Sequence, residues 1–335
     1  KFLPPLQPLD GGWGAPRPMS IAFIDLHPAP TDLKRVVREG LQREPRQLPA
    51  WLLYDAEGSQ LFAAICDQPE YSLTRTEIAL LESHAADIAK AVGSGVVVEF
   101  GIGNAKKVDP LLRALQPKTF VALDISRSAL EHSITGLASQ HPATQMLGIC
   151  CDHSQLEGLP THPWLIGERR IGFFPGSSLG NFTPKDAVLL LQRFRHLLAG
   201  GPLLLGLDQP RDPALLEAAY DDAAGVSKAF AFNLLKRLNR DLQGNALPKN
   251  FRYQARWQAD QQRIEMALVS RCAQTIQLAE SAWSFQPNER WVTEYSVKYN
   301  PDAAADLAAQ AGWQIQQRWH DDHDQISLHL LVPSN

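Results

Sequence analysis

The stretch Val96–Lys107, VVVEFGIGNAKK, decides the fold of this chain, because a run of β-branched residues leads into a loop with two spaced glycines. A buried strand followed by such a loop is typical of the first βα unit of a nucleotide-binding sheet. Glycine at Gly101 and Gly103 permits positive φ and lets a ligand approach the backbone. A structural turn also uses glycine, so the surrounding sequence must distinguish the two interpretations.

The residues after this loop repeat one pattern, in which short apolar segments alternate with amphipathic segments up to PLLLGLD, Pro202–Asp208. This alternation predicts a doubly wound parallel sheet. Beyond Pro210 a long helical segment, 212–242, leads into segments with the period-two alternation of antiparallel strands. The first pattern returns at the end, with a helix over 302–312 and two strands around an acidic turn.

Acidic residues stand at the ends of three successive predicted strands. Glu99 precedes the glycine loop, Asp124 closes TFVALDI, and Asp152 follows TQMLGICC. The second of these acids can bond both hydroxyls of a ribose, while helix N-terminal amides face the same loop. Three acids suit a ribose, an amino-acid tail and an adenine amino group better than a pyrophosphate. The pattern therefore favours S-adenosylmethionine over NAD.

Composition and charge exclude several classes of partner. The net charge of -4, from 32 basic and 36 acidic residues, comes without a basic run, so nucleic acid is not expected. No uncharged stretch is long enough to cross a bilayer, so no membrane partner is expected either. The four cysteines have neither zinc spacing nor disulfide density, and we interpret them as buried thiols in a reducing cytoplasm. We interpret HDDHD, His320–Asp324, as a hairpin turn rather than a metal site, because no third histidine converges on it.

Seven motifs, in order along the chain, carry a resemblance to a known family. They are LLYDAEGSQLF, PEYSLTRTE, EFGIGNAKK, FFPGSSLGNF, AYDDAAGVSKAFAFNLL, RIEMALVS and TEYSVKY. From about Leu48 to Tyr299 the chain resembles the histidine-specific, S-adenosylmethionine-dependent Nα-methyltransferases of ergothioneine biosynthesis. The resemblance implies S-adenosylmethionine as cofactor, L-histidine as small-molecule substrate and hercynine, the trimethylated betaine, as product.

The resemblance also implies the residues of two adjoining sites. The cofactor site would contain Glu99, Gly101, Gly103, Lys107, Asp124 and Asp152. The carboxylate of histidine would be held by Tyr71, Asn181 and Tyr220, and its imidazole by Glu294 and Ser296. Tyr54, Asn233 and Met266 match further positions near that pocket.

The chemistry of these side chains is consistent with such roles. Tyrosine and asparagine donors can hold a carboxylate without placing a protein cation beside the reacting amine. Glu294 can accept from an imidazole N–H and Ser296 can satisfy the second ring nitrogen, which would reject amino acids that leave these groups unpaired. Because an α-amine is mostly protonated near neutral pH, our hypothesis is that Tyr54 or a bound water accepts its proton.

Each of these residues also has a purely structural interpretation. Tyr71 and Tyr220 suit helix packing, Asn181 a helix cap, Met266 a core, and Glu294 with Ser296 a solvated sheet face. The order of the motifs favours the binding roles. One departure concerns specificity, since Ser72 and Leu73 stand where family members often have an aromatic residue and a proline.

We therefore expect an α/β fold in which a Rossmann-like class I methyltransferase sheet carries a second, smaller α+β substrate domain formed by the N-terminal segment and an insertion. The expected divisions are a flexible N-terminal arm over 1–30, a cofactor domain over 80–210 and 298–335, and a substrate domain over 31–79 and 211–297. We expect a cytoplasmic monomer. Three alternatives stay open: a methyltransferase of another amino acid, a non-catalytic amino-acid or S-adenosylmethionine sensor, and an NAD-dependent oxidoreductase.

Overall fold

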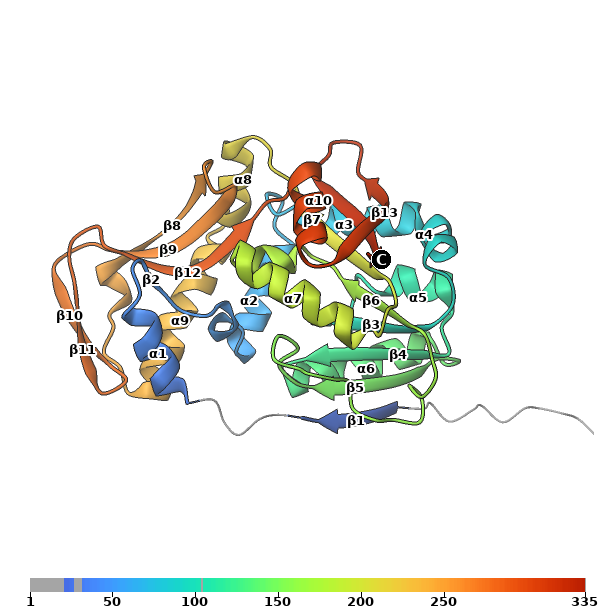
Figure 1. Cartoon of the computed structure of the whole chain (residues 1–335). Coiled ribbons are helices and arrows are strands. Elements are labelled where there is room, and N and C mark those ends of the chain that lie inside the picture. The colour runs from blue at the N-terminus through green and yellow to red at the C-terminus, as the bar shows by residue number, and fades with distance from the viewer. Residues whose placement is uncertain (1–20, 27–31, 104, 335) are drawn as a thin grey trace, which may run out of the picture.

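The computed structural model describes residues 21–26, 32–103 and 105–334 of the chain. Its central sheet has eight strands, and a four-stranded sheet with its own helices stands beside it (Figure 1). In spatial order the central strands are β1 (Ile21–Asp25), β5 (Gln145–Cys150), β4 (Thr119–Asp124), β3 (Val96–Phe100), β6 (Arg170–Phe174), β7 (Leu203–Asp208), β14 (Ile326–Pro333) and β13 (Trp313–His320).

In the central sheet β1, β5, β4, β3, β6 and β7 run parallel to one another. Strand β14 pairs antiparallel with both β7 and β13. The chain moves from β3 through β4 to β5 on one side and reaches β6 and β7 on the other. The direction in which successive strands are added to the sheet thus reverses between β3 and β6. In open parallel sheets, ligands bind at the carboxyl ends of the strands beside such a switch point. The predicted doubly wound sheet is confirmed.

Helices cover both faces of the central sheet, because alternate residues of its strands are apolar on both sides. On one face Val97 and Phe120 pack with α3 (Leu73–Ser83), α4 (Ala85–Val92), α5 (Asp109–Leu115) and α6 (Arg127–Gln140). On the other face Val96 and Val98 pack with α7 (Pro184–Leu197) and α10 (Pro301–Gln310). The 3₁₀ helix η2 (Ser178–Asn181) follows β6.

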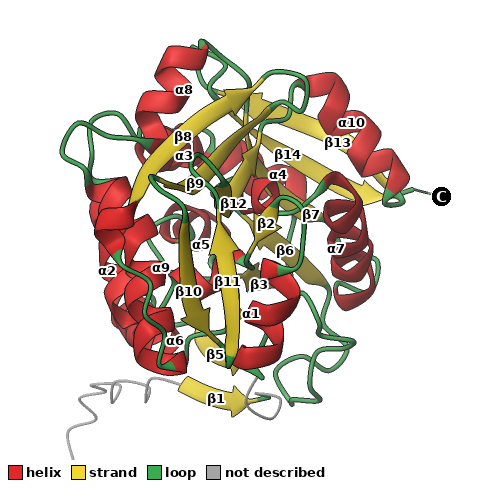
Figure 2. Cartoon of the chain, turned by 90° about the vertical axis from the view of Figure 1, so that its left-hand side faces the viewer, coloured by secondary structure: helices red, strands yellow, loops and turns green. Residues whose placement is uncertain are grey.

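The smaller sheet has the order β2-β12-β9-β8. Its strands are β2 (Arg46–Gln47), β12 (Arg290–Val297), β9 (Arg263–Ser270) and β8 (Phe251–Gln258). Its helices are α1 (Leu33–Leu41), α2 (Ala56–Cys66), α8 (Pro213–Tyr220) and α9 (Val226–Leu242), with the 3₁₀ helices η1 (Ala50–Leu53) and η3 (Pro248–Asn250). The hairpin of β10 (Gln274–Leu278) and β11 (Ser281–Phe285) lies between α9 and α1 in Figure 2, and Arg38 of α1 bonds its turn.

Several expectations need correction. Residues 21–25 were predicted to be part of a flexible arm, but they form β1, which pairs with β5. The Phe23 ring occupies the space that a Cβ at position 148 would fill, which only glycine leaves open. Apart from Leu26, the rest of the predicted arm over 1–30 lies outside the described residues. The boundary expected at 79/80 falls inside α3. The strand pattern of RIEMALVSRCAQTIQL, 263–278, which the sequence analysis counted among the antiparallel segments, is divided into two strands, β9 and β10. Cys272 is exposed rather than buried.

Candidate active site

The glycine loop after β3 has the backbone that the sequence predicts. Gly101 and Gly103 have φ of 83° and 53°, in the left-handed region that favours glycine. Glu99, the fourth residue of β3, is buried, and its Oε2 has no hydrogen-bond partner among the described residues. Burial raises its pKa well above the usual value, while the nearby Lys107 ammonium opposes that shift. A buried acceptor without a donor fits the ammonium of an amino-acid tail.

The other two acids lie at the ends of the adjoining strands, because β3, β4 and β5 are parallel neighbours. Asp124 closes β4; its Oδ2 accepts the Gly103 N–H at 3.3 Å and its Oδ1 accepts the Ser126 N–H at 2.9 Å. Burial raises the pKa of Asp124. Oδ1 of Asp152 accepts from the Ser154 N–H at 2.9 Å and from its hydroxyl at 2.6 Å, which closes a turn after β5. The three carboxylates therefore share one edge of the sheet.

Lys107 is held by an acid that the sequence analysis did not single out. Its Nζ lies 2.8 Å from Oε2 of Glu77, a fully buried residue of α3. The Glu77 carboxylate also accepts the Gly176 N–H at 2.8 and 2.9 Å. Gly176 follows β6 with φ of 79°, and a Cβ there would lie 2.6 Å from Lys107 Nζ. Glu77 thus ties the loops after β3 and β6 together, and its place in the PEYSLTRTE motif was the available signal.

Aromatic rings from three distant segments meet beside this switch point. Tyr71, just before α3, lies edge-on to Tyr220 at the end of α8, with ring centroids 5.8 Å apart. Tyr54, at the end of η1, contacts Phe62 and Phe230 at 5.4 and 5.3 Å. Burial, followed by the charge of Glu294, raises the pKa of Tyr54 well above its usual value.

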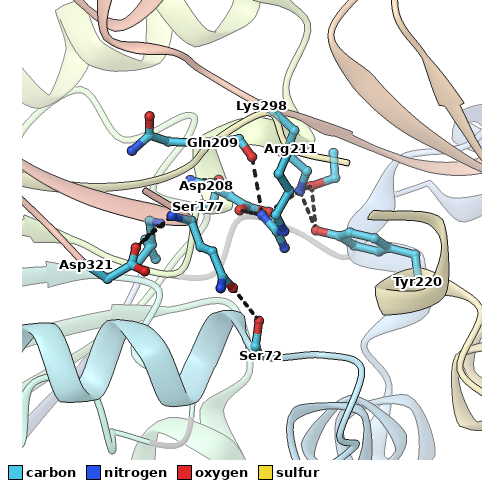
Figure 3. Close-up of polar contacts among 11 residues, drawn as sticks. Ser72, Ser177, Asp208, Gln209, Arg211, Tyr220, Lys298 and Asp321 are labelled. Carbon is cyan, nitrogen blue, oxygen red and sulfur yellow. Dashed lines mark hydrogen bonds and ion pairs between the residues drawn. The ribbon is translucent and has the colours of Figure 1, made fainter. Parts of the chain in front are cut away.

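Lys298 is the centre of a buried polar network in this region (Figure 3). Its Nζ donates to Tyr220 Oη at 2.7 Å and to Ser296 Oγ at 2.8 Å, and it lies 2.5 Å from Asp208 Oδ2. Burial alone would lower the pKa of Lys298, but Asp208 and Tyr220 outweigh it and raise that pKa. Arg211 binds the second oxygen of Asp208.

This network corrects the expectation that the carboxylate-binding group is neutral, since an ammonium is bonded directly to the Tyr220 hydroxyl. Neither Lys298 nor Asp208 was among the residues predicted for the site. Lys298 lies two residues after Ser296 in TEYSVKY, which was the only signal in the sequence.

Glu294 and Ser296 share one face of β12, and both are buried, so the solvated-face interpretation is wrong. A bulge at Thr293, whose hydroxyl donates to the Met266 carbonyl, sets their register. Burial raises the pKa of Glu294 to about 8, although the Lys298 ammonium and a hydrogen bond from Tyr54 act against burial. Oε1 of Glu294 has no partner among the described residues. Met266 pairs with Glu294 across the strands and is itself buried.

The two asparagines of the predicted substrate site lie on different elements. Asn181 ends η2, which packs closely on β12, because a Cβ at Gly180 would lie 2.6 Å from the Val297 carbonyl oxygen. Thr183, not Asn181, caps α7, so the cap interpretation is wrong. Asn233 of α9 donates to Asp55 Oδ1 at 2.7 Å, and its own Oδ1 is buried without a partner among the described residues.

The loop after β6 joins the two groups of residues. Gly176 contacts Glu77 on the side of the glycine loop, and the next residue, Ser177, accepts the Asp208 N–H through its hydroxyl at 2.9 Å. The acidic edge, formed by Glu99, Asp124 and Asp152, therefore lies on one side of this short loop at the switch point. The buried network around Lys298 lies on the other side. This placement suits a reaction between a nucleoside and a small polar molecule.

Comparison with known proteins identifies the family. A family described as "Histidine-specific methyltransferase, SAM-dependent" matches residues 33–333. The chain belongs to this family. This methyltransferase is 35% identical to the "Histidine N-alpha-methyltransferase" of Mycolicibacterium smegmatis, over 90% of this chain and 94% of that protein. The protein of the same name from Mycobacterium tuberculosis is 33% identical, with the same coverage.

A third relative of the methyltransferase is the "Ergothioneine biosynthesis protein 1" of Neurospora crassa, 31% identical over 87% of this chain and 33% of that longer protein. Family membership confirms S-adenosylmethionine as cofactor and overturns the NAD alternative. The HDDHD segment forms the turn between β13 and β14, as predicted, with Asp321 accepting the Ile326 N–H. Within the ranges 21–26, 32–103 and 105–334, no helix has the length and apolarity to span a membrane.

Proposed function

We propose that this methyltransferase adds three methyl groups to the α-amino group of L-histidine and releases hercynine, the first intermediate on the way to ergothioneine. The observation that carries the proposal is the pairing of Glu294 and Ser296 on a buried face, next to Tyr71 and Tyr220. A buried acid and a hydroxyl at this spacing suit the two nitrogens of an imidazole.

The cofactor side of the site would use the edge of the central sheet. S-adenosylmethionine supplies a methyl group on a sulfonium sulfur, which a neutral amine can displace in line. Glu99 would accept the ammonium of its tail and Asp124 its ribose hydroxyls, with Asp152 near the adenine. Gly101 and Gly103 leave the backbone open to the ligand. Lys107 would act indirectly, by keeping Glu77 and Gly176 in place.

The substrate side would bind histidine by its two ends. Tyr71, Asn181 and Tyr220 would hold the carboxylate, while Glu294 and Ser296 would hold the ring. Met266 and Asn233 would shape the wall, Asn233 through its bond to Asp55 at the start of α2. The amine would then face the edge of the central sheet without a direct protein partner, free to reorient between transfers.

A proton has to leave the amine before each of the three transfers, because α-amines are mostly protonated near neutral pH. We keep Tyr54 as the proposed hydrogen-bond acceptor for this proton. Its raised pKa means that the phenol rather than the phenolate is present, so Tyr54 would take the amine proton while its own phenol proton passes to a water molecule.

We further propose that the substrate half comprises 31–79 and 211–297, with α3 extending across its boundary at 79/80. The separate four-stranded sheet and its helices support this division.

We also propose that the protein works as a cytoplasmic monomer. A single species at the mass of one chain in light scattering would agree with the monomer, and a dimer would contradict it.

The function is tested by incubating the protein with S-adenosylmethionine and an equal mixture of the twenty amino acids, followed by mass spectrometry. We expect histidine alone to gain one, two and finally three methyl groups. Methylation of a different amino acid would overturn the histidine pocket, and binding of S-adenosylmethionine without turnover would favour a sensor.

A further inference from the structure

Lys298 contacts two residues of the proposed histidine pocket, Tyr220 and Ser296. The residue is fully buried, and its Nζ donates to Tyr220 Oη and Ser296 Oγ and forms an ion pair with Asp208 Oδ2. The ammonium therefore joins the proposed carboxylate-binding tyrosine, which Figure 3 labels beside Lys298, to the proposed imidazole-binding serine.

Counting hydrogens shows what the ammonium does to the two hydroxyl groups. Tyr220 Oη and Ser296 Oγ lie 2.9 Å apart and each accepts from Lys298, so neither hydrogen can point at the ammonium. One hydroxyl hydrogen occupies the bond between the two oxygens. Only one hydroxyl hydrogen is left to donate outside the network, either from Tyr220 or from Ser296.

We infer that Lys298 is a positioning residue for histidine: it fixes Ser296 as the donor to Tyr220, so that Tyr220 donates to the substrate carboxylate and Ser296 accepts an imidazole N–H. This inference rests on the proposed function. The second imidazole nitrogen then needs a donor, which Glu294 provides in its protonated form. The raised pKa of Glu294, about 8, agrees with that form near neutral pH. The pocket would thus select one tautomer of the neutral ring.

Charge supports the same assignment. Asp208 lies between two cations, Lys298 and Arg211, so the three groups together carry one positive charge. Lys298 is fully buried and the Arg211 side chain is 15% exposed, which limits screening by water. This net positive charge next to Tyr220 favours binding of a substrate carboxylate there. A lysine–aspartate pair without Arg211 would be neutral and would not attract the carboxylate.

The experiment compares K298M with the wild-type enzyme by steady-state kinetics at saturating S-adenosylmethionine. We expect the KM for histidine to rise about tenfold to a hundredfold, the usual range for losing a hydrogen bond to a charged group. The dissociation constant of S-adenosylmethionine, measured by calorimetry, should stay within about twofold, because Lys298 does not touch the acidic edge. K236M, which removes an exposed lysine of α9, is the matched control and should keep the wild-type KM.

Two double variants separate positioning from structural damage. K298M/D208N removes the Lys298–Asp208 ion pair and leaves Arg211 as the one charge of the three groups. A loss caused only by an unpaired Asp208 should disappear in it, and this would overturn the inference. If K298M fails to fold, this double variant provides the same KM measurement. In K298M/Y220F we expect no further rise in KM beyond that of either single variant, because Lys298 acts through Tyr220.

Three outcomes would contradict the inference or its basis. A wild-type KM in K298M would overturn it, and so would losses that multiply independently in K298M/Y220F. Failure of the wild-type enzyme to methylate histidine would instead overturn the proposed function and the inference with it.

Discussion

The Glu77 carboxylate lies 2.8 Å from the Lys107 ammonium and accepts the N–H of Gly176, so one fully buried side chain holds the loops on both sides of the switch point. Glu77 belongs to α3, in the same motif as Tyr71. A segment of the proposed substrate half therefore sets the shape of the cofactor loop. The first prediction follows from this pair.

Replacing Lys107 with methionine removes the cation next to Glu77 and leaves that carboxylate buried and unpaired. We expect the free energy of unfolding to fall by about 3–5 kcal/mol, as for other broken buried pairs. Urea denaturation of the protein without ligand measures it. K185M, at an exposed lysine of α7, is the control and should change stability by less than about 0.5 kcal/mol. Wild-type stability in K107M would show that the pair contributes nothing.

The second prediction concerns the imidazole pocket. Glu294 is buried, with Oε1 free of partners among the described residues. We expect E294A to reduce kcat/KM for histidine by about a hundredfold or more, since a polar pocket that loses one partner no longer matches the ring. Binding of S-adenosylmethionine should be retained. E280A, at an exposed glutamate of the β10–β11 turn, is the control. Equal losses of histidine use and cofactor binding would contradict the pocket assignment.

The third prediction is a pH dependence of stability. The folded-state pKa of Glu294 is raised to about 8 from 4.5, so its contribution to stability is complete below about pH 4.5 and is lost as pH rises through about 8. Within that window the free energy of unfolding should fall by up to about 1.4 kcal/mol per pH unit from this group. E294Q has no proton to lose and should lack this slope. Urea denaturation at pH 5, 6.5 and 8 compares the two, and parallel curves would mean that Glu294 titrates normally.

The fourth prediction tests Tyr54, which bonds Glu294 in the folded protein. We expect Y54F to lower kcat for histidine methylation by about tenfold or more if its oxygen receives the amine proton, in the usual range for acid–base groups. The measurement is initial rate at saturating histidine and S-adenosylmethionine. Unchanged turnover in Y54F would remove Tyr54 from the chemistry and leave it a packing residue.

The sequence predicted those parts of the fold that local pattern determines. VVVEF and TFVALDI are short, apolar and bounded by turns, so their burial between two helix layers followed directly. The strand β1 was missed because IAFID pairs only with β5, far away in the chain, and no local signal marks that pairing. Helix α3 crosses the expected boundary, and Glu77, which was assigned to the substrate half, bonds Lys107 and Gly176 of the cofactor half.

In the site, too, the sequence predicted features that lie within one segment and missed contacts between residues far apart in the chain. Glycines and strand-end acids are local features, and they lie together at the sheet edge as expected. The ion pair joins Asp208, the last residue of β7, to Lys298, the residue after β12, and neither residue looks unusual in its own segment. Their effect on Tyr220 depends on distances that only folding creates.

The position of that ion pair bears on attempts to change what this enzyme methylates. Asp208 ends β7 and Lys298 follows β12, so both stay with the host when segment 211–297 is exchanged for that of another protein. Tyr220 and Ser296 leave with the exchanged segment. A chimera would then inherit a buried ammonium that needs two hydroxyl oxygens from the donor. Successful grafts should be those whose donor segment carries hydroxyl side chains at both positions.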